Sequence, residues 1–398
     1  MKILILHRVP FHKIQYDRGI DHQKHDVVYV GTSESLENIP EALRCTKIVR
    51  AGVRPTSTEV IQLLKGETFD KVISLSEYEL LEAALIREAF GVQGLSYRQT
   101  SLVRDKMLMK QAVMRKGIRT PLHEPCTEMT DSAWSGKTVV KPVSGASSQN
   151  VTVHLTKQDA ISFVNTEAEA GTLDPESYEI EEFIDGPILH IDGLIHEGNL
   201  LSILASRYIG TCLGFAKGLP LGSVQLDPDP ELFAWARECL QAVEISDGAF
   251  HLEAIQTDRG PVFLEVGARV GGADVVDTFE LATGIHMPSV ELKILTGEKI
   301  ERAALTAGSL DRKFGWFVFP GHHFRPIFGG AGGAQEFRDD PRIVRWNELK
   351  AGSPLPRNIT YQSREVPVAG IAVDGDSSHL ELFFKALFQR VKILDLAA

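Results

Sequence analysis

Apolar runs and helical segments alternate along the first 95 residues. Residues 2–9 (KILILHRV), 27–31 (VVYVG) and 71–75 (KVISL) are apolar runs typical of strands buried in a parallel sheet. Segments of helical composition lie at 56–65 and 77–90. The pattern predicts a small doubly wound α/β domain over residues 1–95. No GxGxxG sequence follows its first strand, which argues against a dinucleotide site there.

The next stretch combines a helix with paired strands. Helical spacing over 101–117 ends at Gly117 and places Lys106 in the first turns. Residues 137–156 (KTVVKPVSGASSQNVTVHLT) predict a strand, a loop of small residues at 144–150 and a returning strand, with Lys141 at the base of the loop. Such a hairpin can fold over a triphosphate, because Gly145 lets backbone N–H groups approach and the hydroxyls add donors. A strand at 178–185 (YEIEEFID), two strands within 190–209 and a helix at 230–245 follow.

Residues 250–272 (FHLEAIQTDRGPVFLEVGARVGG) predict a β-hairpin with its turn at 258–261. On its second strand, strict alternation places Phe263 and Glu265 on one side and Val262, Leu264 and Val266 on the other. The second strand is therefore predicted to be half-buried, with one glutamate on its polar side.

Two glutamates of this hairpin carry its candidate chemistry. If pairing is centred near residue 259, Glu253 lies opposite Glu265, with Cβ atoms roughly 4.5–5.5 Å apart. Like charges at that spacing either share a proton or hold a cation between them, and hard oxygen ligands suit Mg²⁺. Arg269 shares this face if the strand continues beyond Gly267. The alternative is a surface hairpin with two solvated glutamates.

The end of the chain is predicted to mix helices and strands. A helix at 289–296, strands at 314–320 and 366–373 and a helix at about 377–391 are predicted, with the glycines at 329–333 in a loop. We interpret residues 299–398 as a compact α+β cap.

Composition limits the classes of function. The chain has 398 residues, 43% of them hydrophobic, and a formal net charge of −11, which argues against non-specific nucleic-acid binding. No apolar run approaches the ~20 residues that span a bilayer, so we expect no membrane partner and a cytoplasmic location. The four scattered cysteines predict reduced thiols and neither a disulfide framework nor a zinc site.

Taken together, the motifs KPVSGASS, EEFIDG and LEVGARVGG resemble those of the ATP-grasp superfamily over roughly residues 100–297. Within it, the chain looks most similar to the carboxylate–amine ligases that join amino acids, including the L-amino-acid ligase branch. The resemblance implies an α/β (α+β) ATP-grasp fold. Its parts would be an N-terminal α/β domain at 1–95, a two-lobed ATP-binding domain at 96–298 with its phosphate-loop lobe at about 120–185, and the cap at 299–398.

The resemblance also implies roles for individual residues. Lys106 and Lys141 would contact ATP phosphates, and Glu253 and Glu265 would bind Mg²⁺, or alternatively Mn²⁺. Arg269 would meet the substrate carboxylate or the developing acyl phosphate, acting with Lys141 in catalysis. The loop at 144–149 would close over the phosphates and contact them through Ser144, Gly145, Ala146, Ser147 and Ser148. The adenine would be held by Glu181 and by the backbone of Glu182, Phe183 and Ile184.

Three positions depart from the family pattern. Gly267 stands where a metal-binding Asn is frequent, and Ile188 stands where an acidic residue takes the ribose, with His190 or Asp192 as substitutes. The phosphate loop ends in residues 149–150 (QN) where glycine is common. Arg207 and Lys217 could reach a phosphate or a carboxylate, or lie on the surface.

The expected activity is ATP-dependent activation of a carboxylate, such as that of an amino acid, as an acyl phosphate, followed by attack of an amine. Two alternatives stay open. One relative type loads an amino acid onto the thiol of an acyl carrier protein, and a silent nucleotide-binding module would keep the fold without turnover. We expect small-molecule carboxylate and amine substrates and, as the commonest oligomer, a homodimer.

Overall fold

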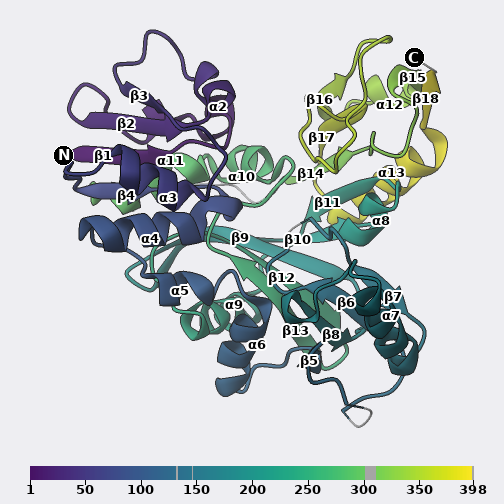
Figure 1. Cartoon of the computed structure of the whole chain (residues 1–398). Helices are drawn as coiled ribbons and strands as arrows, with labels where there is room; N and C mark the ends of the chain where they lie inside the picture. Colours follow the sequence, from purple (N-terminus) through teal and green to yellow (C-terminus); the bar gives the residue numbers. More distant parts are fainter. Residues whose placement is uncertain (131–132, 146, 301–310, 397–398) are drawn as a thin grey trace.

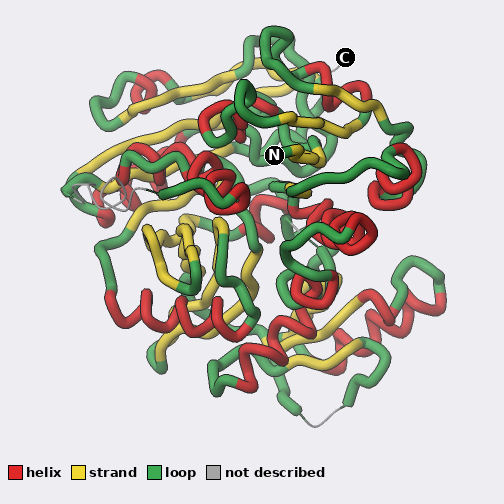
Figure 2. Tube along the Cα trace, turned by 90° about the vertical axis from the view of Figure 1, so that its left-hand side faces the viewer, coloured by secondary structure: helices red, strands yellow, loops and turns green. Residues whose placement is uncertain are grey.

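The computed structural model describes residues 1–130, 133–145, 147–300 and 311–396. Helices and strands are mixed throughout the chain (Figure 2). In the view of Figure 1, the N-terminal sheet and the C-terminal segment occupy the two upper corners, and the long strands of the central sheet run below and between them. Among the helices described, none is both long and apolar enough to cross a membrane.

The N-terminal part is a parallel sheet in the order β3-β2-β1-β4. Its strands are β1 (Lys2–Leu6), β2 (Asp26–Gly31), β3 (Thr46–Val49) and β4 (Lys71–Ile73). The associated helices are α1 (Phe11–Ile14), α2 (Ser33–Glu37), α3 (Thr56–Leu63), α4 (Leu80–Phe90) and α5 (Tyr97–Ser101). The three predicted strands are confirmed as β1, β2 and β4. β3 was missed because its short sequence TKIV is largely exposed and carries no apolar run.

An antiparallel sheet of eight strands forms the centre, in the order β13-β12-β9-β10-β11-β14-β17-β16. These are β9 (Ile188–His196), β10 (Asn199–Ile209), β11 (Leu221–Gln225), β12 (Gly248–Thr257), β13 (Gly260–Gly267), β14 (Lys313–Val318), β16 (Ile343–Glu348) and β17 (Val368–Asp374). β14 pairs with β11, so the C-terminal strands extend the central sheet.

A small sheet, β5-β8-β6-β7, lies beside the hairpin β12–β13 and is covered by α7 (Figure 1). Its strands are β5 (His123–Pro125), β6 (Thr138–Pro142), β7 (Thr152–His154) and β8 (Tyr178–Glu182), and α7 spans Lys157–Glu169. β6 and β7 form the predicted hairpin around the small-residue loop.

The remaining elements surround the central sheet. The helices are α6 (Lys106–Arg115), α8 (Cys212–Ala216), α9 (Pro230–Ala242), α10 (Val275–Thr283), α11 (Met287–Thr296), α12 (Gln335–Arg338) and α13 (Ser377–Arg390). A two-stranded sheet pairs β15 (Ile327–Gly332) with β18 (Lys392–Leu396). The prediction of a loop for the glycines at 329–333 was therefore wrong, because β18 supplies a pairing partner from the far end of the chain.

The hairpin β12–β13 reaches the predicted register by a different route. Its turn is Asp258 and Arg259, and Ala254 pairs with Phe263. A β-bulge then shifts the register by one residue, so that Glu253 pairs with Glu265 as predicted.

The same bulge makes the predicted sides of the second strand wrong. Phe263 and Val266 both enter one hydrophobic core, while Leu264 and Glu265 both line a cavity on the other side. Strict alternation cannot anticipate this, because one extra residue at a bulge reverses the side of every position beyond it.

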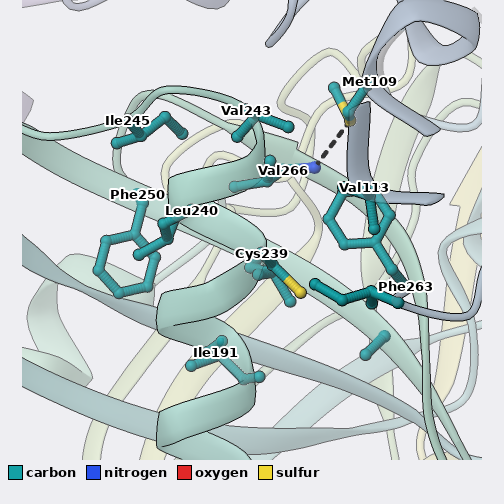
Figure 3. Packing of buried hydrophobic residues seen from close by; sticks show 14 of the residues in the cluster. Met109, Val113, Ile191, Cys239, Leu240, Val243, Ile245, Phe250, Phe263 and Val266 are labelled. Atoms are coloured by element: carbon teal, nitrogen blue, oxygen red, sulfur yellow. Dashed lines mark hydrogen bonds between the residues drawn. The ribbon is translucent and has the colours of Figure 1, made fainter. Parts of the chain in front are cut away.

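That core connects the hairpin to α6 and α9. Figure 3 shows Cys239 and Leu240 of α9, with Val243 at its C-cap, against Phe250, Phe263 and Val266; Met109 and Val113 of α6 belong to the same cluster. The backbone N–H of Val266 also donates to the Met109 sulfur at 3.2 Å (Figure 3). Packing thus fixes α6, and with it the start of that helix, against the glutamate-bearing strand.

Candidate active site

A cavity of about 440 Å³ lies between the small sheet and the hairpin β12–β13. That volume is within the range of small-molecule sites. The structure brings most of the predicted site residues to its walls: Lys106, Lys141, Gly145, Ser147, Ser148, Glu181, Glu182, Phe183, Ile184, Glu253 and Glu265. These residues come from α6, the β6–β7 hairpin, the end of β8 and the β12–β13 hairpin, which are far apart in the sequence.

Three other predicted site residues are absent from this list of wall residues. Ser144 is not in the wall, and its carbonyl accepts a hydrogen bond from Arg104 at 3.2 Å. Ala146 lies outside the described residues. Arg269 lines a neighbouring cavity, because β13 ends at Gly267 and the strand does not continue to it. Its guanidinium donates to Glu77 at 2.6 Å and to the carbonyl of Val270 at 2.7 Å.

Lys106 is the first residue of α6, which begins after Asp105. The Asp105 carboxylate caps the helix by accepting from the N–H of Leu108 at 3.0 Å. The Lys106 ammonium lies 2.9 Å from Glu265 and donates to the carbonyl of Gly145, also at 2.9 Å. It therefore connects the helix, the small-residue loop and the hairpin.

The charge of Glu265 is fixed by its neighbours. Burial opposes its ionisation, but the ammonium groups of Lys106 and Lys141 outweigh burial and lower the pKa of Glu265 to about 2. The carboxylate is consequently ionised at any physiological pH, which is the form that binds a metal ion.

Lys141 belongs to a buried cluster of charges. Its ammonium lies 2.6 Å from Glu181 and 3.7 Å from Glu179. Lys110 donates to the same two carboxylates at 2.6 and 2.7 Å. Burial would raise the pKa of Glu181, but the two lysines lower it to about 2.

Sequence reasoning missed Lys110 and Glu179, although signals for both exist. Lys110 is one helical turn beyond Lys106, and Glu179 alternates with Glu181 on β8, so each pair shares a face. These two residues hold Lys141 and Glu181 in the cavity wall.

Glu253 and Glu265 face one another across the hairpin and line the same cavity. Their carboxylate oxygens are the hard ligands that Mg²⁺ and Mn²⁺ take, so the donor set fits a divalent cation. Gly267 provides no third side-chain ligand.

Glu253 is held by a hydrogen-bonded chain across neighbouring strands. The Tyr208 hydroxyl donates to it at 2.8 Å, and the ring of His251 lies 3.4 Å from the same oxygen. His251 in turn lies 2.7 Å from Asp192. Burial would lower the pKa of His251, but Asp192 and Glu253 raise it to about 9, so the ring is a cation that donates to both carboxylates.

The suggested ribose contacts are engaged elsewhere. His190 and Asp192 are buried and absent from the cavity wall. The Nδ1 atom of His190 lies 2.5 Å from a carboxylate oxygen of Asp192. Arg207 pairs with Glu381, and Lys217 ends α8 outside the wall.

The loop between β6 and β7 has an unusual backbone. Ser147, Ser148 and Asn150 adopt φ angles of 59°, 51° and 58°, in the left-handed region that few residues other than glycine populate. Such conformations cluster at ligand clamps, where they turn backbone N–H groups toward a bound anion.

Residues 103–273 match the model of the ATP-grasp domain family. This segment is similar to ATP-grasp domains, and the chain has an ATP-grasp fold. The matched segment includes Lys106, Lys141, the loop, β8, the hairpin β12–β13 and Arg269, so the cavity is built almost wholly from the ATP-grasp domain. The family uses ATP with Mg²⁺ or Mn²⁺.

Individual proteins show the same relationship. An L-arginine-specific L-amino acid ligase of Bacillus subtilis is 24% identical over 273 residues, which cover 66% of this chain and 65% of that relative. The structure of an L-amino acid ligase from Bacillus licheniformis superposes with a TM-score of 0.72 at 20% identity, covering 99% of this chain and 98% of that one. The biotin carboxylase domain of a 2-oxoglutarate carboxylase from Hydrogenobacter thermophilus, solved with MgADP, gives 0.63 at 12% identity, covering 99% and 90%. These likenesses show an ATP-grasp fold along the whole chain.

Proposed function

We propose that this protein is an ATP-dependent carboxylate–amine ligase that joins two small molecules through an amide bond. One observation carries the proposal: two facing carboxylates, Glu253 and Glu265, share a cavity with Lys106 and Lys141. Cations and a carboxylate pair that can hold a metal ion are what a triphosphate needs for binding and transfer.

The chemistry balances in two steps. A substrate carboxylate oxygen attacks the γ-phosphorus of ATP, and ADP leaves, which gives an acyl phosphate. The nitrogen of an amine then attacks the acyl carbon, phosphate leaves, and the amine proton passes to a base or to water. A divalent cation at Glu253 and Glu265 would supply charge neutralisation during the first step.

We assign the following roles. Lys106 and Lys141 would donate to phosphate oxygens, and the loop at 144–148 would close over them and exclude water. The end of β8, with Glu182, Phe183 and Ile184, would contact the adenine, because these residues line the cavity. Arg269 would stabilise the carboxylate as it becomes an acyl phosphate.

The substrate assignment is supported by the two amino acid ligases above. A short match to a dapdiamide A synthase of Enterobacter agglomerans, 50% identical over 44 residues, covers only 11% of this chain and 10% of that protein. We therefore infer that the acid is an amino acid or a close derivative. The free cysteines are in keeping with a cytoplasmic reaction.

The test is an assay of ADP and phosphate release against amino acids, supplied singly and in pairs, with and without Mg²⁺. Turnover that needs two free amino acids supports the proposal. Turnover that needs an acyl carrier protein would replace the amine with a thiol acceptor, and nucleotide binding without turnover under any condition would contradict an enzymatic role.

A further inference from the structure

A second cavity, of about 680 Å³, adjoins the nucleotide cavity. Ser147 of the phosphate loop lines both cavities. Arg269 lines the second one and is close enough to Glu265 for the two charges to interact. The second cavity therefore begins beside the residues assigned to the phosphates and extends away from them.

Besides Ser147, its walls come from four parts of the chain. Residues 8–15 follow β1 and residues 75–78 follow β4, at the carboxyl ends of two adjacent parallel strands. Residues 269–277 lead into α10, and residues 345, 347 and 362–365 come from the C-terminal part. Ligands of open α/β sheets commonly lie at such strand ends.

Three of the four acidic side chains that line this cavity form ion pairs with arginines, and two of the three share a single arginine. Glu77 pairs with Arg104 and Arg269. Asp274 and Asp277 both pair with Arg345, at 2.7 and 2.6 Å.

The basic side chains are less fully paired. Lys13 and Arg364 form no ion pair within the described part of the chain, and neither does Arg8, whose guanidinium lies 5.0 Å from the ring centre of Tyr78. Glu365, the fourth acidic residue of the wall, accepts a hydrogen bond from the hydroxyl of Thr360 at 2.8 Å.

Lys13 is the most informative of these cations. It lies on α1 and is half-buried. The carboxylates of Asp274, Glu365 and Asp277 and the guanidinium of Arg345 are near enough to affect its charge, but none of them forms an ion pair with it. Burial lowers the pKa of Lys13 more than those carboxylates raise it, because the ammonium has lost water without gaining a bonded partner. A cation in that position is stabilised by any anion that enters the cavity.

We propose that the second cavity binds an amino-acid substrate whose side chain carries a further anionic group, and that Lys13 and Arg364 receive that group. The inference rests on the proposed ligase function and names the substrate's charge class. With its α-carboxylate directed to Arg269, an amino acid with a neutral side chain would leave Lys13 and Arg364 without an anionic partner, and a cationic side chain would be repelled by them.

Isothermal titration calorimetry with the full chain and an ATP analogue tests the charge class directly. The probes are L-aspartate, L-glutamate and O-phospho-L-serine against L-asparagine, L-glutamine and L-arginine. We expect aspartate and glutamate to bind roughly tenfold or more tighter than asparagine and glutamine, since a hydrogen bond to a charged partner is lost in the amide. The comparison of glutamate with phosphoserine separates a carboxylate from a phosphate.

Two variants on separate segments identify the recognising residues. Lys13→Met and Arg364→Gln should each weaken binding of the preferred anionic probe by roughly ten- to a hundredfold and leave the amide probes within about twofold. Lys65→Met, an exposed lysine outside both cavities, is the matched control and should change neither.

The outcomes separate this inference from the function on which it rests. Turnover with neutral or cationic amino acids at equal or better kcat/KM, unchanged in Lys13→Met, would overturn the inference and leave the ligase function standing. Binding of anionic amino acids without ADP release would support the charge class and contradict the ligase function. A preference for L-arginine would contradict the charge class outright.

Discussion

The ammonium of Lys106 lies 2.9 Å from the carboxylate of Glu265, although 158 residues separate them in the sequence. Lys106 begins α6, and Glu265 lies at the β-bulge of β13. The contact of Met109 with Val266 holds the two elements together. This pair marks the end of the cavity where we place the phosphates.

Replacing Glu265 by glutamine should lower the kcat of Mg²⁺-dependent turnover at least about a hundredfold, because an amide oxygen is a neutral and weaker metal ligand. The fold should persist, since glutamine has nearly the same shape. Steady-state release of ADP measures the first effect and circular dichroism the second. Glu238→Gln, an exposed position on α9, is the control, and near-normal rates in Glu265→Gln would count against the site.

Tyr208 should act as a positioning residue for Glu253. In Tyr208→Phe the carboxylate loses the hydroxyl donor at 2.8 Å, and we expect Mn²⁺ affinity to fall roughly 10- to 100-fold, as for other residues that orient a metal ligand. Electron paramagnetic resonance titration with Mn²⁺ measures affinity without turnover. An affinity equal to that of the exposed control Tyr97→Phe would show that Tyr208 does not orient the carboxylate.

Lys110 should matter for stability. The side chain is fully buried between Glu179 and Glu181, and its removal in Lys110→Met leaves two buried carboxylates with Lys141 as their remaining cation. We expect a loss of about 3–5 kcal/mol in the free energy of unfolding, measured by urea denaturation. The double variant Lys110→Met/Glu179→Gln should recover part of that loss. Lys116→Met, exposed at the end of the same helix, should cost little.

Glu291 makes stability depend on pH. Burial raises its pKa from 4.5 to about 7, against the smaller opposite effect of the N–H of Ala249. A folded pKa above the unfolded one means that this stability is complete below pH 4.5 and is lost as pH rises through 7, by roughly 3 kcal/mol. Glu291→Gln should therefore be relatively more stable at pH 8 than at pH 5 when compared with the parent. Equal differences at both pH values would contradict this origin, and Glu41→Gln is the exposed control.

Much of the fold could be predicted because its signals are local. The apolar runs of β1 and β2, the helical spacing of α6 and the turn of the hairpin β12–β13 each depend on a few consecutive residues. β15 could not be predicted in this way, since it exists only through pairing with β18 about 65 residues later.

The candidate site, like the fold, could be predicted from the sequence only in part. Spacing alone placed Glu253 opposite Glu265, but the sides of Phe263 and Leu264 depend on a bulge that periodicity does not encode. The second cavity combines the ends of β1, β4 and β13 with C-terminal residues, and the role of Lys13 emerges only when those segments meet.

The central claim is that Glu253 and Glu265 hold the divalent cation that accompanies ATP. The most direct measurement is anomalous diffraction from a crystal grown with Mn²⁺ and a non-hydrolysable ATP analogue. The account predicts an anomalous peak within roughly 2.0–2.5 Å of oxygens from both carboxylates, with Lys106 and Lys141 on the phosphates. A peak at the buried group of His190, Asp192 and His251, whose ligand atoms lie within 4.8 Å of one another, with none at the hairpin, would contradict it.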